Sequence, residues 1–405
     1  MVNGMRWVDC DMHIIEPEDL FDRYLEPAFK HRITTLKDSE GNPFSSGFLR
    51  FFWLIDGKPI SREQTRGYYR KISTPPAARP QRIIDKYRFA SERGFDPESQ
   101  LMAMEMEGID LAVLFPTAGL YLMARNDLEP RFALAICQAY NNWLCDFAQY
   151  SPAQFRWVAM LPPQDVNLAC QELVRCVNKG AVGSFFNPNP PGEQYWNSNY
   201  WEPLYYLHEE MDVAWCFHSS VGAWNASDVE NRYGPQQMCR HIVGHWVEAQ
   251  LAITSQIAGG VFEAHPDLRV GYLEAQAAWA PGLLSRMQWD FGTFRKDDAP
   301  YLSLKPKEYF QRNCWISVEG GEPEILPTVQ LLGADHLCIS TDYPHPDSEF
   351  PEVSKELVEH VPADIAAKIF RGAMGLFNLD DEDMKKAEEA AVKRTRKREE
   401  KIVVR

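Results

Sequence analysis

The residues with the clearest chemical potential lie near the N-terminus, in the stretch VDCDMHIIEP. Asp9, Asp11 and His13 alternate with apolar residues, and in an extended strand this alternation places the three side chains on one face. Burying carboxylates there is costly unless a cation compensates their charge. A divalent metal ion would provide that compensation. The other interpretation is that Asp9 or Asp11 caps a following turn or helix, and the motif alone leaves both open.

Elements elsewhere in the chain must position such a motif. Near-continuous apolar runs separated by helical segments are typical of buried parallel strands. Eight such runs occur, one starting at Trp7 and the others at residues 111–115, 157–161, 181–186, 213–218, 268–274, 314–318 and 337–342. Helices are predicted at 18–32, 97–107, 131–150, 167–178, 200–210, 243–258, 280–290, 325–332 and 363–376. This alternation predicts an α/β fold, a single (β/α)8 TIM barrel.

The predicted organisation has three parts. Residues 1–379 form the barrel, and residues 33–98 form an N-terminal insertion with little periodicity, including a hairpin around Asp56-Gly57. Irregular segments of this length are often functional, so the insertion is a candidate lid or interface. Residues 380–405 are charged nearly throughout and predict a solvated C-terminal helix or a disordered tail.

Barrel enzymes place their chemistry at the C-terminal ends of the strands. The predicted ends carry Asp11 and His13, then His218, Glu274 and Asp342. Each alone has another explanation, because His218 would suit a hydrogen-bonded loop and the carboxylates would cap turns. Together they form a mixed nitrogen and oxygen ligand set, which suits Zn, Mn or Fe.

Composition narrows the class of partner. The formal net charge of −15 argues against nucleic acid and anionic membrane, which attract basic surfaces, and favours a small-molecule substrate. Nine cysteines occur singly with no CxxC pair, as expected of buried thiols in a reducing compartment. The start of the chain lacks a signal-peptide pattern, and no apolar run is long enough to span a membrane. We therefore expect a cytoplasmic protein.

Several segments resemble the amidohydrolase-related family, the second amidohydrolase group of the metal-dependent hydrolase superfamily. They are VDCDMHIIEP, VAWCFHSS, the long run GHWVEAQLAITSQIAGGVFEAHPDLRVGYLEAQAAWAPGLLSRM, STDYPHPDS and the closing IFRGAMGLFNL. The resemblance covers roughly residues 6 to 379 and is weakest over the insertion. It implies a metal bound by Asp11, His13, His218 and Asp342. Such relatives include hydrolases of cyclic or aromatic amides and esters, nonoxidative aromatic acid decarboxylases, and some dinuclear iron or manganese-iron oxygenases.

The sequence departs from the pattern of most amidohydrolases in three places. The first strand carries Asp-x-His where they have His-x-His, and the sixth strand ends in Glu274 where they usually carry a histidine. No lysine ends the fourth strand, at residues 183–187, so the sequence predicts that the carboxylated lysine that bridges two metals is absent. These departures disfavour a dinuclear zinc hydrolase of the usual type.

Other histidines remain candidates for roles around this centre. His245 begins the helix after the fifth strand, and with Glu274 as a bridge it would hold a second metal; otherwise it is a capping or stacking residue. His345 would orient Asp342 or contact substrate. His241 is expected to face solvent, and His265 is expected to be structural, at the far end of the barrel.

Three functional hypotheses follow. The first is a metal-dependent hydrolase or decarboxylase of a small, cyclic or aromatic substrate, in which His218 and Asp342 are catalytic and His345 or Glu274 relays a proton. The second is a dinuclear iron or manganese-iron oxygenase that hydroxylates a small acid or amine. The third is a non-catalytic barrel subunit of a hetero-oligomer, which predicts a missing ligand. A homo-oligomer or hetero-oligomer is expected in each case.

Overall fold

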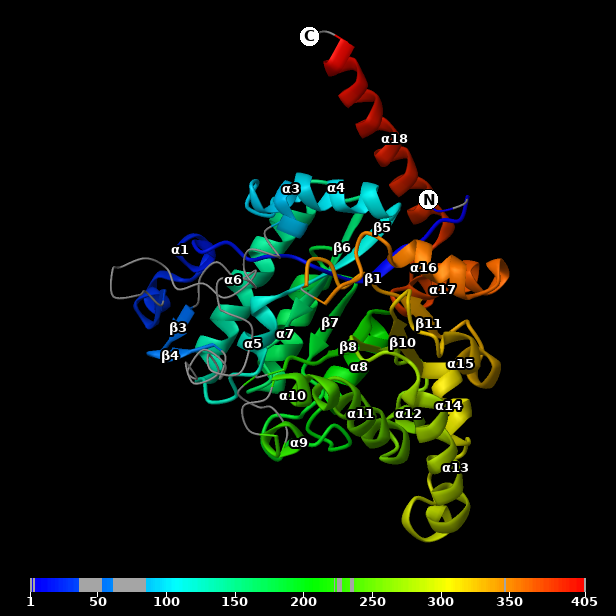
Figure 1. The fold of residues 1–405 in the computed structure, drawn as a ribbon. Helices are drawn as coiled ribbons and strands as arrows, with labels where there is room; N and C mark the ends of the chain where they lie inside the picture. Colours follow the sequence, from blue (N-terminus) through cyan, green and yellow to red (C-terminus); the bar gives the residue numbers. More distant parts are fainter. Residues whose placement is uncertain are drawn as a thin grey trace.

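The computed structural model describes residues 2, 4–35, 53–60, 85–221, 223, 228–233, 237–345 and 347–403. Its centre is a sheet of parallel strands in the order β1-β5-β6-β7-β8-β9-β10-β11 (Figure 1). The strands are β1 (Val8–His13), β5 (Leu111–Phe115), β6 (Phe155–Met160), β7 (Gly183–Phe186), β8 (Ala214–His218), β9 (Val270–Leu273), β10 (Cys314–Val318) and β11 (Leu337–Ile339). The eight predicted strands are thereby confirmed.

The two edges of the sheet meet through the segment that follows β11. The backbone N–H of Asp342 donates to the carbonyl of Asp11 at 3.2 Å, and the N–H of His13 donates to the carbonyl of Tyr343 at 2.7 Å. These bonds replace a regular ladder between β11 and β1 and nearly close the barrel. The predicted TIM-barrel class is confirmed.

Helices surround the sheet, and most of the nine predicted helical ranges agree with an observed helix to within a few residues. They are α1 (Leu20–Tyr24), the 3-10 helix η1 (Pro27–Arg32), α3 (Arg88–Ser91), α4 (Pro97–Glu107), α5 (Ala118–Met123), α6 (Pro130–Ala148), α7 (Val166–Val177), α8 (Glu202–Glu210), α9 (Asp228–Asn231), α10 (Gln237–Gly244), α11 (Trp246–Ala258), α12 (Val261–Ala264), α13 (Trp279–Asp298), α14 (Pro306–Asn313), α15 (Ile325–Leu332), α16 (Val353–His360), α17 (Ala363–Leu376) and α18 (Asp381–Val403). No helix of the described part of the chain is long and apolar enough to cross a membrane.

The continuous helix predicted at residues 18–32 is wrong. The chain forms α1, leaves the helical region at Leu25 and Glu26, and continues as η1. The cause is Pro27, because a proline disfavours helical backbone at the residue before it.

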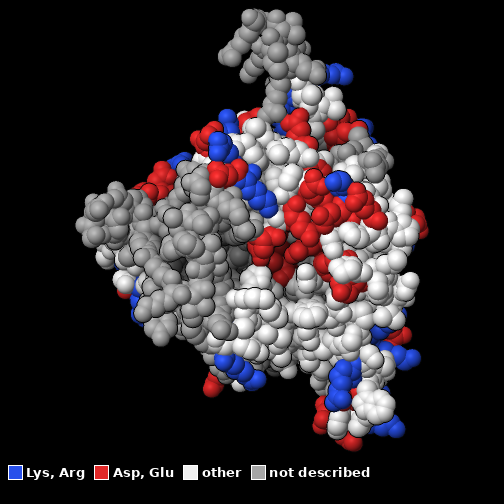
Figure 2. All heavy atoms as spheres, in the orientation of Figure 1, with Lys and Arg blue, Asp and Glu red and all other residues white. Residues whose placement is uncertain are grey.

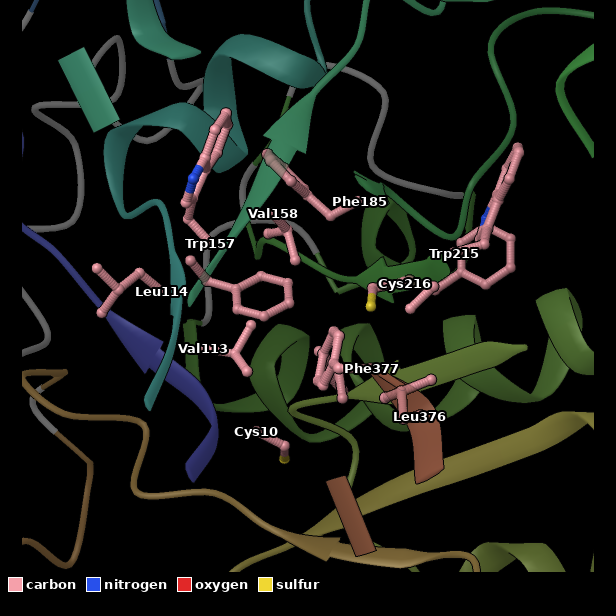
Figure 3. Close-up of a cluster of buried hydrophobic side chains, with 14 of the residues drawn as sticks. Cys10, Val113, Leu114, Trp157, Val158, Phe185, Trp215, Cys216, Leu376 and Phe377 are labelled. Carbon is pink, nitrogen blue, oxygen red and sulfur yellow. The ribbon is translucent and has the colours of Figure 1, made fainter. Parts of the chain in front are cut away.

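The barrel core is apolar and continuous with the outer helices. Figure 3 shows side chains of five neighbouring strands, including Cys10, Val113 and Cys216, meeting Leu376 and Phe377 from the end of α17. α17 approaches closely because Gly372 has no side chain; a Cβ there would lie 1.9 Å from the carbonyl oxygen of Leu337. The carboxyl ends of the strands, with their polar residues, therefore stand on a rigid base.

The described part of the insertion consists of a small antiparallel sheet of β2 (Ile33–Thr35), β3 (Trp53–Ile55) and β4 (Lys58–Pro59), followed by residues 85–98 with α3 and the start of α4. The predicted hairpin at Asp56-Gly57 is confirmed, with both residues at positive φ, as such a tight turn requires. Residues 36–52 and 61–84 lie outside the described residues, so the predicted lid or interface stays a prediction.

The C-terminal segment is helical as far as Val403. Of the two predicted alternatives, a helix or a disordered tail, the structure shows the helix. Met384 and Ala387 are buried, and Arg6 and Arg156 bind Glu388 and Asp383 at 2.6 and 2.8 Å. The base of α18 thus packs on the barrel while its far end projects from it (Figure 1). The predicted division between residues 379 and 380 stays a prediction.

A buried histidine of α8 that contacts β7 makes stability sensitive to acid. His208 contacts the Ser184 hydroxyl through Nε2 at 2.8 Å and the Leu204 carbonyl through Nδ1 at 2.7 Å. Burial lowers its pKa from 6.5 to about 4. Below pH 6.5 the unfolded chain therefore binds a proton that the folded protein excludes, so stability falls as pH falls and levels off below about 4. The loss is about 3 kcal/mol, at 1.36 kcal/mol per pKa unit.

Urea unfolding of the protein and of His208→Gln between pH 7 and pH 4 measures this contribution. We expect the variant to lose about 3 kcal/mol less than the parent over that range. Equal losses in the two proteins would contradict a buried neutral imidazole at this position.

Candidate metal centre

The strand ends bring the predicted residues to one mouth of the barrel. Asp11 and His13 are among the last three residues of β1, and His218 is the final residue of β8. Glu274 directly follows β9. Asp342 lies three residues after β11. All five are buried or nearly so, as expected of residues that act on a sequestered substrate or ion.

The inner cluster consists of Asp11, His13 and His218. The Nε2 atoms of the two imidazoles are 3.1 Å apart. The Asp11 carboxylate lies across them, with Oδ1 3.3 Å from His13 Nε2 and Oδ2 3.2 Å from His218 Nε2. Three potential ligands thus converge on one point from β1 and β8.

The outer nitrogens of the same imidazoles bind backbone carbonyls. His13 Nδ1 donates to Pro116 at 2.6 Å, and His218 Nδ1 donates to Ser219 at 2.9 Å. This arrangement leaves the Nε2 lone pairs directed into the cluster, and such outer hydrogen bonds orient metal-binding imidazoles. Both histidines are therefore held in the tautomer that a metal requires.

The donor set fits a divalent cation. Both Asp11 oxygens are buried and accept no hydrogen bond, an arrangement that is costly without a positive charge. Burial opposes ionisation of Asp11, but the imidazoles of His218 and His13 outweigh it and hold the pKa of that carboxyl below its ordinary value. The pKa of His13 is lowered, chiefly by burial, so its lone pair is available at neutral pH. Two carboxyl groups and two imidazoles match zinc, manganese or iron.

Asp342 and His345 extend the cluster from the other side. Asp342 Oδ1 lies 3.3 Å from His13 Nε2 and 2.6 Å from His345 Nδ1, and the His345 ring stacks on His13 at 3.9 Å. Burial raises the pKa of Asp342 to about 7 and lowers that of His345 to about 4. Asp342 has a positive φ of 51°, a conformation uncommon outside glycine and often found at functional sites.

Glu274 faces three histidines at the edge of the cluster. Its Oε2 lies 3.5 Å from His218 Nδ1 and 3.4 Å from His245 Nδ1, and its Oε1 lies 4.0 Å from His345 Nδ1. His245 directly precedes α11 and shares a 2.6 Å hydrogen bond with the Ser219 hydroxyl. Among the described residues, the groups of ligand atoms that all lie within 4.8 Å of one another do not include His245 or Glu274. A second metal at this pair stays a prediction.

The other two histidines named from the sequence, His241 and His265, are not part of the cluster. His241 is half-buried and pairs with Asp347 at 3.0 Å, so the prediction that it faces solvent is only partly right. His265 binds Glu209 at 2.6 Å and Glu202 at 3.2 Å, before β9 begins. Its predicted structural role at the far end of the barrel agrees with these contacts.

Sequence reasoning missed residues that position the cluster. The Glu16 carboxylate accepts N–H bonds from Thr117, Ala118 and Gly119 at 2.9 to 3.2 Å, which fixes the loop that holds His13. Thr117 also contacts His345 Nε2 at 3.3 Å. Only the three-dimensional fold brings Glu16 to this loop, so no local signal identifies it.

Glu319 was also missed, although it directly follows β10 and the strand-end rule that identified Glu274 applies to it. Burial, reinforced by the charge of Asp342, raises the pKa of Glu319 to about 8. The mouth therefore contains one more carboxyl group than the predicted set indicates, and Figure 2 shows acidic side chains gathered on this face of the molecule.

Asp9 serves the cluster indirectly. Its carboxylate accepts bonds from the N–H of Asp11 at 3.1 Å, from the N–H of Thr341 at 3.2 Å and from the Thr341 hydroxyl. A register shift in β1 lies between Asp9 and Met12, which interrupts the simple alternation on which the row Asp9, Asp11, His13 was predicted. Asp9 thus links β1 to the segment carrying Asp342.

Replacing Asp9 by alanine is expected to lower the free energy of unfolding by about 3 kcal/mol, because buried donors lose their acceptor. Asp9→Asn retains an acceptor oxygen of the same size and should change it by about 1 kcal/mol or less. Thermal and urea unfolding of both variants measure the difference. Equal destabilisation by the two substitutions would contradict the linking role.

The fold and the buried donor set define the class of protein, a metal-dependent barrel enzyme. The sequence profile of the amidohydrolase family matches residues 8–379. The chain belongs to that family, as the sequence segments indicated.

Two relatives by sequence are decarboxylases. The 2-amino-3-carboxymuconate-6-semialdehyde decarboxylase of Dictyostelium discoideum is 25% identical over 276 residues, which are 68% of this chain and 73% of that protein. The gamma-resorcylate decarboxylase of Rhizobium radiobacter is 25% identical over 262 residues, 61% of this chain and 76% of that protein.

Solved structures share the fold at lower identity. An amidohydrolase from Mycobacterium avium subsp. paratuberculosis superposes with a TM-score of 0.72 at 19% identity, covering 92% of this chain and 99% of that one. The manganese-bound 5-carboxyvanillate decarboxylase of Novosphingobium aromaticivorans has a TM-score of 0.66 at 17% identity, covering 93% and 98%. Family and donor set together make the protein a metal-dependent enzyme of the hydrolase or decarboxylase group.

Proposed function

We propose that the protein is a metal-dependent, nonoxidative decarboxylase of a small aromatic acid. The observation that carries the proposal is the buried set Asp11, His13, His218 and Asp342, in which neither Asp11 oxygen accepts a hydrogen bond. The relatives at 25% identity that act on carboxylic acids support the reaction class. The non-catalytic alternative is disfavoured, because it predicts a missing ligand and all four residues are present.

Asp11, His13, His218 and Asp342 would hold the ion. A divalent metal bound there supplies positive charge that grips a carboxylate and stabilises negative charge on a neighbouring oxygen. The protein orients these ligands, because the Pro116 and Ser219 carbonyls accept hydrogen bonds from the outer nitrogens of His13 and His218. Burial of the ligands also excludes water from the site.

Decarboxylation breaks the bond between the ring carbon and the carboxylate carbon, releases CO2 and requires a proton at the ring carbon. The Asp342–His345 pair, joined at 2.6 Å, is placed to hold that proton beside the cluster. Thr117 at His345 Nε2 fixes the orientation of the imidazole. General acid catalysis requires a proton donor within hydrogen-bond reach of the reacting atom, which is the role we assign to this pair.

Hydrolysis by a dinuclear zinc centre is less well supported. The fourth barrel strand, β7, ends in Phe186 and is followed by Asn187, so this strand end offers no lysine for carboxylation. Asp11 takes the place of a first-strand histidine. A single ion that grips a substrate carboxylate fits this set without a bridging group.

The test is CO2 release from a panel of hydroxybenzoates, including 2,6-dihydroxybenzoate and 5-carboxyvanillate, by protein stripped with chelator and reloaded with Mn²⁺ or Zn²⁺. We expect activity on at least one acid, loss of activity with chelator and recovery with metal. One ion per chain is the expected stoichiometry. Hydrolysis of an amide or lactone with no CO2 release from any acid would contradict the proposal.

A second candidate is the dinuclear iron or manganese-iron oxygenase. It is favoured by the Glu274 carboxylate, which lies within 3.5 Å of both His218 and His245 and would bridge two ions. Elemental analysis of protein purified without oxygen separates the two functions. About two iron or manganese ions per chain would support the oxygenase, since two redox metals are needed there.

A further inference from the structure

The end of the insertion contacts the segment that carries Asp342 and His345. The Tyr87 hydroxyl, just before α3, donates to the backbone carbonyl of His345 at 3.1 Å. The neighbouring Lys86 ammonium donates to the backbone carbonyl of Ser348. Two adjacent residues of the insertion therefore hold the backbone on the C-terminal side of Asp342, although neither belongs to a strand of the barrel.

The Tyr87 side chain is fully buried and packs on other aromatic residues. Its ring meets Tyr343 edge to face, with 5.2 Å between the centroids, and lies 5.9 Å from the ring of Phe350. Phe89 adds a second contact with Tyr343 at 6.4 Å. Aromatic pairs at these separations are favourable, and a buried hydroxyl ordinarily has a hydrogen-bond partner. The packing restricts the ring, and the His345 carbonyl provides that partner.

The turn from Asp342 to His345 is secured at its Asp342 end by the barrel. The Asp342 N–H donates to the carbonyl of Asp11 at 3.2 Å, and the His345 N–H donates to the carbonyl of Asp342 at 2.8 Å. At the His345 end, the Thr117 hydroxyl contacts ring Nε2 at 3.3 Å, and Tyr87 binds the backbone. The imidazole is thus held from two sides, through its ring and through its main chain.

Beyond His345 the chain returns to the end of β11. The Ser348 hydroxyl donates to the carbonyl of Thr341 at 2.6 Å, and the N–H of Phe350 donates to the Ser348 hydroxyl at 3.1 Å. Lys86 binds the carbonyl of the same serine. The base of the segment is therefore fixed by hydrogen bonds of its own, and the Tyr87 hydroxyl acts on the turn itself.

We propose that Tyr87 is a positioning residue for the proton-holding pair, because its hydroxyl fixes the main chain of His345 and thereby keeps the imidazole 2.6 Å from Asp342. This role rests on the proposed function. Misplacing a reacting group by about 1 Å can cost about 100-fold in rate, so a contact outside the ligand set affects the reaction. The insertion thereby gains a part in the geometry of the site, separate from the lid or interface predicted from the sequence.

Tyr87→Phe tests the role, because it removes one hydroxyl group and keeps the ring that packs on Tyr343. For the acid that the protein decarboxylates, we expect kcat to fall about tenfold while KM stays within about twofold of the parent. Binding of Mn²⁺ to the metal-free variant should match that of the parent, because the four ligands are unchanged. A loss of Mn²⁺ affinity that accounts for the lost activity would overturn the proposal.

Hydrogen exchange of the metal-free protein provides a readout that does not depend on activity. The peptide that spans the turn from Asp342 to His345 should exchange about fivefold faster or more in Tyr87→Phe, because one hydrogen bond that restrains the turn is lost. Peptides of β8 should exchange as in the parent. If no acid releases CO2, the proposed function fails, whereas faster exchange confined to the turn still supports Tyr87 as its restraint.

The matched control is Tyr205→Phe, the same substitution at another buried tyrosine. The Tyr205 hydroxyl also donates to a backbone carbonyl, that of Trp196 at 2.7 Å, and its ring lies 5.5 Å from that of His265, outside the candidate metal centre. This variant should change kcat by about twofold or less and leave exchange of the turn unaltered. Parental kcat or parental exchange in Tyr87→Phe would overturn the proposal. Equal losses of kcat in the two variants would overturn it as well, because they would reflect a general loss of stability.

Discussion

His218→Ala is expected to lose the bound metal and to reduce kcat/KM by about 10⁴-fold or more, which corresponds to about 5.5 kcal/mol of transition-state stabilisation. His218 Nε2 lies 3.1 Å from His13 Nε2 and 3.2 Å from Asp11 Oδ2. Removing it takes a neutral nitrogen donor from the centre of the ligand set. The Asp11 carboxylate, fully buried, is then left with one imidazole beside it.

Metal content after dialysis and activity at saturating metal measure this effect separately. The control is His265→Ala, which also removes a buried imidazole but lies at the other end of the barrel, paired with Glu209 and Glu202. That variant should lose stability and keep its metal. A His218→Ala protein that binds metal as tightly as the parent would refute the assignment.

The fold was predictable because its determinants are local and repeated. Each buried strand is a short apolar run, such as residues 111–115 and 314–318, and the structure places strands there. The failures have local causes as well. Pro27 divides the predicted first helix, and β11 is only three residues long because the backbone after Ile339 bends toward β1.

The candidate site was partly predictable for a related reason. Residues at strand ends meet whenever the strands form a barrel, so Asp11, His13, His218 and Asp342 could be grouped without coordinates. The hydrogen bonds that orient these ligands come from loop residues. The spacing of residues along the sequence does not indicate which residue a loop will contact. Glu16 reaching Thr117, and Asp9 reaching Thr341, are therefore visible only in three dimensions.

Asp342→Asn is expected to lower kcat by about 10³-fold even when metal is saturating. The amide has the volume of the carboxyl group but carries no charge and cannot take up and release a proton. The substitution also removes one of the two carboxyl groups of the ligand set, which should weaken metal binding by about 10–100-fold. Measuring kcat over a range of metal concentrations separates the two effects.

The matched control is Asp335→Asn, two residues before β11 and so at the other end of that strand. Its carboxylate is exposed and pairs with Lys368 at 3.1 Å, outside the cluster, so its loss should change kcat by about threefold or less. If Asp342→Asn recovers full kcat at high metal concentration, Asp342 only holds the ion, and the proton must come from another group. His245, 2.6 Å from Ser219, would then be the next candidate, because it is the remaining imidazole at the mouth that faces Glu274.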